Sequence, residues 1–190
     1  MKEIKTLHIK NMVCPRCIMA VRQCLERLGL HPLSVELGTA VLPEPLDEDC
    51  RHLVAEALQA LGFELLDDPR ARLVEQIKNT IVDLVHYRDG QPKANLSGYL
   101  STKLHRDYSA LSKLFSETTG TTIEHYFIAQ KIERAKELLV YDELTLNEIA
   151  DRLGYSSAAY LSTQFKQVTG LTPSHFKRLK ENKRRGLDEI

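Results

Sequence analysis

The sequence predicts an α+β protein in which a small domain with the element order βαββαβ precedes an all-α domain. Two observations carry this prediction. In the first 68 residues, segments with alternating apolar residues are interrupted twice by segments whose apolar residues recur at helical spacing. In the second half, a set of residues recurs about 50 positions later, which indicates two copies of one helical unit. We therefore divide the chain into residues 1–68 and residues 69–190.

Each element of the first domain has its own signal. The expected order is a strand over residues 2–9, a helix over 15–28, a hairpin of 33–37 and 39–42, a helix over 47–61 and a strand over 63–66. Asp47 is a good N-cap and Gly62 a good helix stop. The apolar stripes of the two helices, which we expect to face inward, are Val21, Cys24, Leu25 and Leu28, and then Leu53, Val54, Ala57, Leu58 and Leu61. This order is the split arrangement of ferredoxin-like domains.

The repeated unit of the second domain is predicted to be a helix, a short turn and a second helix. Seven residues of the first copy return in the second at the same spacing: Leu111, Ser112, Phe115, Thr119, Gly120, Thr122 and His125 recur as Leu161, Ser162, Phe165, Thr169, Gly170, Thr172 and His175. In the second copy Thr145 and Glu148 form a capping box, and Gly154 ends the helix. Ser156 or Ser157 caps the next helix, whose expected inward residues are Ala158, Leu161, Phe165 and Val168.

The first copy follows the same plan. We expect a helix over residues 96–104, a turn through His105 and Arg106, and a helix that Asp107 caps and that ends before Gly120. A connector helix over 123–140 joins the copies, with an apolar stripe of Ile128, Ile132, Ala135, Leu138 and Leu139. Within each copy, two helices joined by a short turn form a helix-turn-helix unit, whose second helix can enter a DNA major groove. A helical bundle without a ligand is the alternative that the repeat leaves open.

Spacing and charge both bear on a DNA partner. The connector helix spans roughly 27 Å at about 1.5 Å per residue, so it could hold the two short helices about one DNA turn, roughly 34 Å, apart. The chain has no net charge, but residues 1–68 hold 7 basic and 11 acidic side chains and the remainder holds 19 and 15. The two parts thus carry about −4 and +4, which indicates separate roles. A local basic face matters more for DNA binding than this total.

Three segments of the second domain carry a resemblance to a known family. The runs KIERAKELL (131–139), IADRLGYSS (149–157) and GLTPSHFKR (170–178) resemble the AraC/XylS family of transcription regulators, over about residues 71–180. The resemblance implies seven helices, with an opening helix over 71–87, and recognition helices over 108–116 and 157–166. It also implies sequence-specific binding of double-stranded DNA, with activation through RNA polymerase favoured over repression.

The resemblance transfers base-facing roles to seven positions. These are Ser109, Ser112 and Lys113 in the first recognition helix, and Ala158, Ala159, Ser162 and Thr163 in the second. Because none is an arginine that could grip guanine with two hydrogen bonds, we expect thymine methyl contacts and DNA shape to supply part of the specificity. Cations near helix ends are candidates for phosphate contacts, namely Arg106, Lys166, Lys177 and Arg178. A solvated surface charge is the alternative for each of them.

A cysteine pair marks the first domain. Cys14 lies in the loop before the first helix, and Cys17 lies in its first turn behind Pro15. The positive end of the helix dipole favours thiolates there. Two thiolates suit Cu(I), and the same softness admits Ag(I) or Hg(II). Zn(II) is a weaker alternative, because no histidine or carboxylate follows at zinc-finger spacing. Cys24 and Cys50 lie on the apolar stripes of their helices and are expected to be core residues.

Residues 3–68 resemble the heavy-metal-associated domain of copper chaperones and metal-pumping ATPases, whose motif is Met-x-Cys-x-x-Cys. The matching residues are Met12, Cys14 and Cys17. The resemblance implies that Met12 packs beneath the loop without binding metal and that Phe63 lies close to the site. Asn11 stands where that family usually has glycine.

Together these features predict a cytoplasmic transcription regulator that responds to a soft metal ion. Metal bound by the cysteine pair would change the pose or the self-association of the first domain, as a monomer or a metal-linked homodimer. Three alternatives stay open: a module that docks a metal chaperone or dimerises, a thiol redox switch, and a loop that binds nothing. We expect no enzyme, because no nucleophile–base pair or phosphate-binding glycine loop is present. We expect no secretion signal and no membrane span, because the chain has no long apolar stretch.

Overall fold

The computed structural model describes residues 5–88 and 95–179 of the chain. It divides into two compact units, residues 1–79 and residues 80–190. The predicted domain boundary after residue 68 lies at the start of helix α3 (Pro69–Val82), whereas the division between the two units falls between residues 79 and 80 of this helix. No helix in the described ranges is long and apolar enough to cross a membrane.

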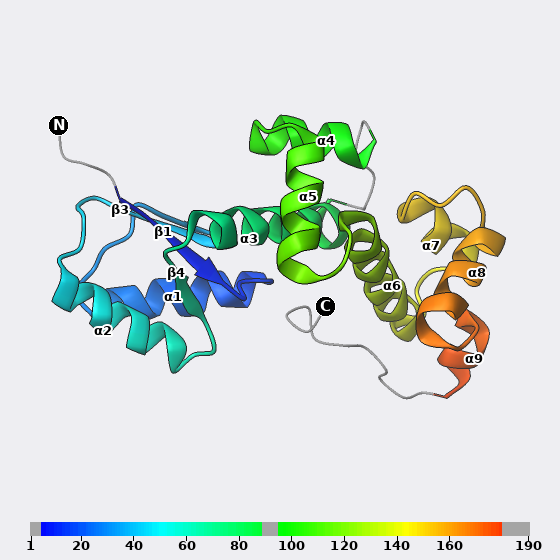
Figure 1. Cartoon of the computed structure of the whole chain (residues 1–190). Coiled ribbons are helices and arrows are strands. Elements are labelled where there is room, and N and C mark those ends of the chain that lie inside the picture. Colours follow the sequence, from blue (N-terminus) through cyan, green and yellow to red (C-terminus); the bar gives the residue numbers. More distant parts are fainter. Residues whose placement is uncertain (1–4, 89–94, 180–190) are drawn as a thin grey trace. The chain divides into compact units, whose positions relative to one another are not determined.

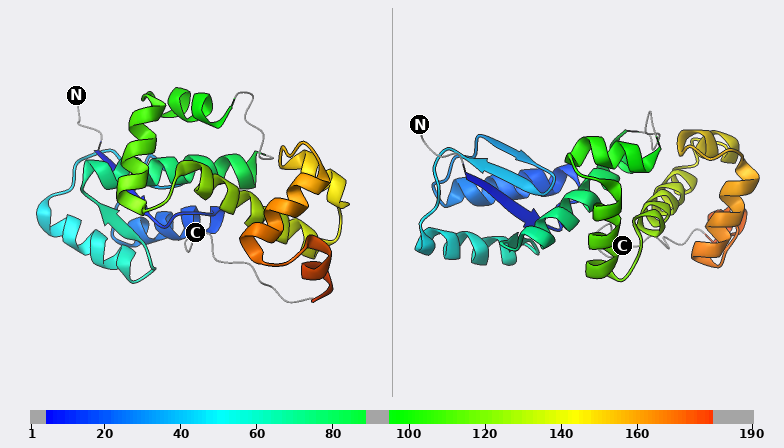
Figure 2. Two further views of the ribbon diagram at one scale, coloured as in Figure 1. Left: turned by 45° about the vertical axis from the view of Figure 1, so that its right-hand side comes forward. Right: turned by 45° about the horizontal axis from the view of Figure 1, so that its top comes forward.

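The first unit contains a four-stranded antiparallel sheet with two helices on one face (Figures 1 and 2). Its elements are β1 (Lys5–Lys10), α1 (Pro15–Arg27), β2 (Ser34–Glu36), β3 (Thr39–Leu42), α2 (Glu48–Gln59) and β4 (Glu64–Leu66). The strands lie in the order β2-β3-β1-β4, and β1 is central, with β3 on one side and β4 on the other. The expected succession of strands and helices is therefore present, although residues 2–4 of the expected first strand lie outside the described residues.

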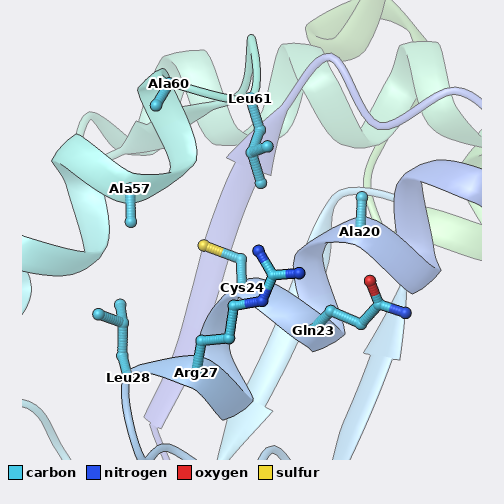
Figure 3. Close-up of a pocket in the computed structure, with 8 residues that line it drawn as sticks. All are labelled: Ala20, Gln23, Cys24, Arg27, Leu28, Ala57, Ala60 and Leu61. Carbon is cyan, nitrogen blue, oxygen red and sulfur yellow. The ribbon is translucent and has the colours of Figure 1, made fainter.

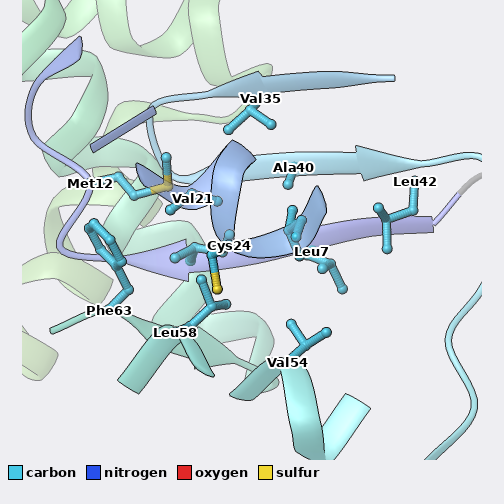
Figure 4. Close-up of a cluster of buried hydrophobic side chains, with 12 residues drawn as sticks. Leu7, Met12, Val21, Cys24, Val35, Ala40, Leu42, Val54, Leu58 and Phe63 are labelled. Carbon is cyan, nitrogen blue, oxygen red and sulfur yellow. The ribbon is translucent and has the colours of Figure 1, made fainter. Parts of the chain in front are cut away.

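Alternation along β1 builds the core of this unit. Leu7 points to the helix-covered face, where it packs with Val21 of α1 and Leu58 of α2 (Figure 4). Ile9, two residues further along the strand, is buried in the same cluster. Asp47 caps α2 as expected, because its carboxylate accepts a hydrogen bond from the amide of Cys50. Burial of these side chains on one face of the sheet is what holds both helices in place.

Four apolar residues that were predicted to face inward are exposed in the structure. Leu28 caps the C-terminus of α1, and Leu61 follows the end of α2, so both lie beyond the last buried turn. Leu53 stands next to Val54, which occupies the core position of that turn. Val168 lies in the last turn of its helix, past the buried Phe165. These residues are exposed because they lie at or beyond the end of their helix, or because a neighbouring residue occupies the core position.

The second unit is all helical in the described part (Figure 1). Helix α3 runs into a π-helix, η1 (Asp83–Tyr87), so the expected opening helix over 71–87 changes its winding at Asp83. The following helices are α4 (Leu96–Leu104), α5 (Tyr108–Thr119), α6 (Ile123–Tyr141), α7 (Leu146–Arg152), α8 (Ala158–Thr169) and α9 (Pro173–Arg178). Helix α6 contacts η1, α5, α7, α8 and α9, so it is the central element of this unit.

The connector helix α6 buries polar residues as well as its apolar stripe. Ile132, Ala135, Leu138 and Leu139 are buried as expected, and Ile128 packs against them. Four polar residues of α6 are buried too, namely Gln130, Lys131, Glu133 and Lys136. Two polar contacts hold three of these residues: Lys136 pairs with Glu133 at 2.7 Å, and Oε1 of Gln130 lies 3.0 Å from Nε2 of His86 in η1. The apolar pattern of the sequence does not indicate this second buried side of the helix.

Candidate nucleic-acid interface and cysteine loop

The two predicted helix-turn-helix units, α4–α5 and α7–α8, have the same local construction. Asp107 caps α5 by accepting a hydrogen bond from the amide of Ser109 at 2.8 Å. Ser157 caps α8 by accepting one from the amide of Tyr160 at 3.1 Å. Both helices end at a glycine with positive φ, Gly120 and Gly170, a conformation that side chains with a Cβ rarely adopt. Thr145 and Glu148 form the expected capping box at the start of α7.

The inner sides of α5 and α8 also match. Phe115 packs on Tyr126 with ring centroids 5.7 Å apart, and Phe165 packs on Phe176 at 5.6 Å. After each phenylalanine a threonine hydroxyl donates to its carbonyl oxygen, at 2.7 Å in the first copy and 2.8 Å in the second. The repeat read from the sequence is therefore a structural repeat, and the residues that recur are those that fix each helix to its neighbours.

The outer face of α8 carries small and polar side chains. Of the four predicted base-facing residues, Ala159 and Thr163 are exposed, whereas Ala158 and Ser162 are half-buried. The hydroxyl of Ser162 donates to the carbonyl oxygen of Ala158 at 2.8 Å, and that of Thr163 donates to Ala159 at 3.0 Å. Because these hydroxyl protons are engaged inside the helix, Ala159 and Thr163 offer their methyl groups to a partner on this face.

The outer face of α5 is more polar. Ser109 and Lys113 are exposed, and Ser112 is half-buried. The hydroxyl of Ser109 donates to the carboxylate of its own N-cap, Asp107. Nζ of Lys113 lies 4.0 Å from a carboxylate oxygen of Glu117, one turn further along the helix. Such an exposed pair contributes little to stability, so Lys113 can exchange this partner for another anion at small cost.

Two outward residues were missed by the sequence analysis. Tyr160 and Gln167 are exposed on α8 and lie three residues before and four residues after Thr163, on the same face. The signal was available in the sequence, because the inward positions Leu161 and Phe165 already define which face of the helix is free. The base-facing positions that the family resemblance implies do not include these two residues.

The four predicted phosphate-contact residues lie at helix ends. Arg106 lies in the turn before α5, Lys166 in the last turn of α8, and Lys177 and Arg178 at the end of α9. All four are exposed. Lys177 forms an ion pair with Asp142, the residue that ends α6 in the left-handed conformation. Cations at these places can neutralise an anionic backbone without reading sequence.

The cysteine loop joins β1 to α1. Sγ of Cys14 and Sγ of Cys17 lie 3.1 Å apart, so the structure brings the two predicted metal ligands together. Cys14 is the N-cap of α1, and its carbonyl oxygen accepts a hydrogen bond from the amide of Cys17 at 2.9 Å. Pro15 occupies the first helical turn as expected. In the described ranges no cluster of three or more His, Cys, Asp and Glu side chains is suited to a metal ion.

The acidity of Cys17 differs from the expectation. Burial raises the pKa of the Cys17 thiol, and its hydrogen bond with Cys14 raises it further. Backbone hydrogen bonds at Val13 and Cys14 act in the opposite direction and do not offset this. Burial therefore opposes the thiolate that the helix start favours at Cys17, and a metal ion that binds there has to displace the proton.

Residues around the loop hold its shape. Met12 is fully buried beneath it, and Phe63 is buried in the same core (Figure 4). Asn11 has a φ of 70°, so it adopts the left-handed conformation that favours glycine. Its side-chain amide donates to the carbonyl oxygen of Gly62 at 3.1 Å, and its backbone amide donates to Oε1 of Glu75 at 3.0 Å. The loop is thus tied to the end of α2 and to α3.

The other two cysteines lie apart from this loop in the fold. Cys24 is buried between α1 and α2, and burial raises the pKa of its thiol, in keeping with the predicted core role. Cys50, for which a core position was also predicted, is only half-buried at the start of α2. A surface pocket of about 460 Å³ opens beside Cys24 (Figure 3), and Leu28 and Leu61, 37% and 48% exposed, line it. These two leucines border the pocket instead of filling the core.

The second unit is similar to known helix-turn-helix proteins. The family described as helix-turn-helix domain matches residues 100–179. The transcriptional regulatory protein YesN of Bacillus subtilis is 33% identical over 91 residues, which is 47% of this chain and 25% of that protein. The xylose operon regulatory protein of Escherichia coli is 38% identical over 69 residues, 36% of this chain and 18% of that protein. The chain therefore spans a quarter or less of the length of these curated relatives.

A solved structure agrees with the fold of this part. The C-terminal domain of AraT, a response regulator from Geobacillus stearothermophilus, superposes with a TM-score of 0.51 at 26% identity. The match covers 62% of this chain and 95% of that domain. The helical half of the chain is therefore built like the domain of a bacterial regulator, with α4–α5 and α7–α8 as its two helix-turn-helix units.

Proposed function

We propose that this chain, whose C-terminal part is a helix-turn-helix DNA-binding domain of the AraC family, is a sequence-specific transcription regulator and not an enzyme. One observation carries the proposal: α5 and α8 each begin at a side-chain N-cap, end at a left-handed glycine and bury a phenylalanine against a second aromatic ring, and each leaves an outer face exposed. Two copies of one presented helix suit two successive segments of major groove in double-stranded DNA.

The two helices offer different contacts to DNA. Lys113 gives α5 a charged group that can reach a base or a phosphate. Helix α8 offers the methyl groups of Ala159 and Thr163, which fit the thymine methyl group. The exposed cations Arg106, Lys166, Lys177 and Arg178 hold the protein on the DNA backbone.

The test of this proposal is selection of bound sequences from random DNA, followed by footprinting and gel-shift titration. The full-length protein should select one motif with two half-sites about one helical turn apart. Lys113→Ala should weaken binding to that motif, whereas the charge-matched control Arg27→Ala, in α1, should not. Absence of any selected motif, with only salt-dependent general binding, would remove the proposal.

A second proposal concerns the first unit, which we infer to be a ferredoxin-like domain that binds a soft metal ion at Cys14 and Cys17. The sheet order β2-β3-β1-β4 with both helices on one face supports the fold, and the 3.1 Å between the two Sγ atoms supports the site. Two sulfur ligands suit Cu(I), with Ag(I) and Hg(II) as further candidates and Zn(II) as the least suited. Met12 and Phe63 pack next to the loop and keep its surroundings apolar.

The metal proposal is tested with Cu(I) under reducing conditions, by competition with a chromophoric chelator. The wild type should bind one Cu(I) per chain, or one per two chains if the ion links a homodimer. Cys14→Ser/Cys17→Ser should lose this binding, and Cys50→Ser, which removes a thiol elsewhere, should keep it. Equal binding of Cu(I) by all three proteins would refute the proposed site at Cys14 and Cys17.

The regulatory link is tested on DNA. If the metal controls the regulator, Cu(I) changes the affinity for the selected motif, or transcription by RNA polymerase in the cytoplasm, only when both cysteines are present. Metal transfer from a chaperone without a change in DNA affinity would instead indicate a docking module. A response to peroxide, with no response to Cu(I), would indicate a thiol redox switch.

A further inference from the structure

A buried cation lies beneath the turn of the second helix-turn-helix unit. Lys131 of α6 is only 8% exposed, and its Nζ lies 3.8 Å from the ring centroid of Tyr155 and 5.2 Å from that of Phe127. In the described part of the chain no carboxylate lies within ion-pair distance of this amine, and burial lowers the pKa of Lys131 to about 8. Two aromatic faces thus take the place of a counter-ion for this cation.

Tyr155 connects this cation to helix α8. The residue lies in the turn between α7 and α8, with Lys131 against its ring. Its hydroxyl donates to Oε1 of Gln164 at 2.6 Å, and its ring meets the ring of Tyr160 edge-on, with centroids 5.9 Å apart and planes at 63°. One buried ring therefore contacts the amine on α6 and two side chains on α8.

The first helix-turn-helix unit has no such arrangement. Fifty residues earlier in the chain stand Ile81, His105 and Ala110 in place of Lys131, Tyr155 and Tyr160. Both turns contain a left-handed residue, His105 with a φ of 51° and Gly154 with a φ of 67°. His105 is exposed, whereas Gly154 is followed by the buried ring of Tyr155. The contacts of Lys131 and Tyr155 therefore belong to the second unit and follow from a difference between the repeats.

Tyr160 is the exposed end of this set of contacts. The side chain is 54% exposed, in the first turn of α8, on the face that also carries Ala159 and Thr163. Residues at the N-terminal end of a recognition helix contact base edges. A tyrosine that is already oriented by a neighbouring ring loses little side-chain freedom when it binds, and its hydroxyl can both donate and accept.

We propose that Tyr160 contacts base edges in the half-site read by α8, and that Lys131 is a positioning residue that acts on Tyr160 through Tyr155. This proposal rests on the proposed function, because it names further residues of the same DNA-reading surface. It predicts that changes at these buried and exposed positions affect one half-site and leave the other unchanged.

The experiment compares three DNA duplexes: the selected motif, the motif with the α8 half-site scrambled, and the motif with the α5 half-site scrambled. Footprinting with Lys113→Ala, which affects the α5 side, assigns the half-sites. Tyr160→Ala should lose about tenfold in affinity on the full motif and none on the duplex whose α8 half-site is scrambled. The matched control is Tyr141→Ala, an exposed tyrosine at the end of α6, which should bind all three duplexes like the wild type.

The positioning role is tested with Lys131→Met and Lys131→Arg. Lys131→Met should reproduce the half-site-specific loss of Tyr160→Ala, and Lys131→Arg, which keeps a cation over the ring, should restore most of the affinity. If Lys131→Met is unfolded by circular dichroism, Lys131→Gln carries the test, because it removes the cation over the ring of Tyr155 and keeps a polar side chain at this position.

Two results would overturn the inference. One is a loss of equal size on all three duplexes, which would place Tyr160 on the DNA backbone and Lys131 in general stability. The other is full affinity of both Tyr160→Ala and Lys131→Met. A wild type that selects no motif is a different outcome, because it refutes the proposed function itself.

Discussion

The backbone amide of Asn11 donates a hydrogen bond to Oε1 of Glu75, which lies 64 residues later in the chain. Asn11 begins the loop that carries Cys14 and Cys17, and Glu75 lies in α3, the helix that leads toward the second unit. Glu75 is buried, and this burial raises the pKa of its carboxyl group, while the bond from Asn11 acts in the opposite direction. The shape of the cysteine loop thus depends on a carboxylate that sequence patterns did not single out.

We predict that Glu75→Leu is less stable than Glu75→Gln by about 1–3 kcal/mol. Both variants remove the charge, but only glutamine keeps an oxygen that accepts the hydrogen bond of Asn11, and a partly buried amide without an acceptor is costly. Chemical denaturation of the two variants at pH 7 measures the difference. Equal unfolding free energies would show that the bond does not hold the loop.

The same residue gives a pH dependence with a defined sign. Because the pKa of Glu75 is higher in the folded protein than in the unfolded chain, the folded state keeps a proton that the unfolded state releases. The stability of the wild type should fall as pH rises through this window, and Glu75→Gln lacks the effect. The stability of Glu75→Gln relative to the wild type should therefore increase from pH 4 to pH 7, as measured by urea unfolding. A constant difference across this range would contradict the assignment.

Gly38→Ala should destabilise the first unit more than Gly29→Ala does. Both glycines have positive φ, so alanine at either position costs about 1–2 kcal/mol in backbone conformation. At Gly38 the added Cβ would also lie 2.1 Å from Nδ2 of Asn79, whereas nothing lies within 4 Å at Gly29. Thermal unfolding measures both. In an Asn79→Ala background the excess at Gly38 should disappear, and its persistence would mean that the clash is not its source.

Lys131 should make the second unit more stable as pH rises from about 8 to about 10.5. Over this range the folded state has released the proton of the buried amine, while the unfolded chain still holds it, so unfolding must take a proton up. The wild type should gain about 1–3 kcal/mol relative to Lys131→Met across this window.

The control for Lys131 is Lys103→Met, an exposed lysine of α4, which should leave the pH profile of the wild type unchanged. Burial also raises the pKa of Tyr155, which costs stability above about pH 10. This loss is common to the wild type and Lys131→Met, so only their difference is used. Parallel profiles of these two proteins would refute the prediction.

Asp142→Asn should strengthen DNA binding, whereas Lys177→Ala should weaken it. Asp142 forms an ion pair with Lys177, so its removal frees a cation and takes away a negative charge near a predicted phosphate contact. Both effects should be equal on all sequences, and Lys177→Ala should lower the slope of log affinity against log salt by about 1. Salt titrations by fluorescence anisotropy on the selected motif and on unrelated DNA measure this. A change confined to the motif would mean that Lys177 reads bases.

Much of the fold could be predicted from local signals. Asp47, Thr145 and Gly170 marked helix ends correctly, because capping and left-handed glycine depend on a few adjacent residues. The recurrence of Phe115 as Phe165 identified the repeated unit, and the structure places both in equivalent aromatic pairs. The short spacing of Cys14 and Cys17 was enough to predict that their sulfur atoms lie together.

The sequence by itself thus determined the helices and strands, their order, the repeat and the proximity of the cysteine pair, because each depends on interactions between residues close in the chain. Only the tertiary structure decided that Glu75 holds Asn11, that Lys131 lies under Tyr155, and that Leu28, Leu61 and Val168 are exposed. It also decided that the Cys17 thiol is less acidic than its place at a helix start implies. The physical reason is that burial and long-range polar contacts are set by which elements pack together, and periodicity along one helix does not contain that information.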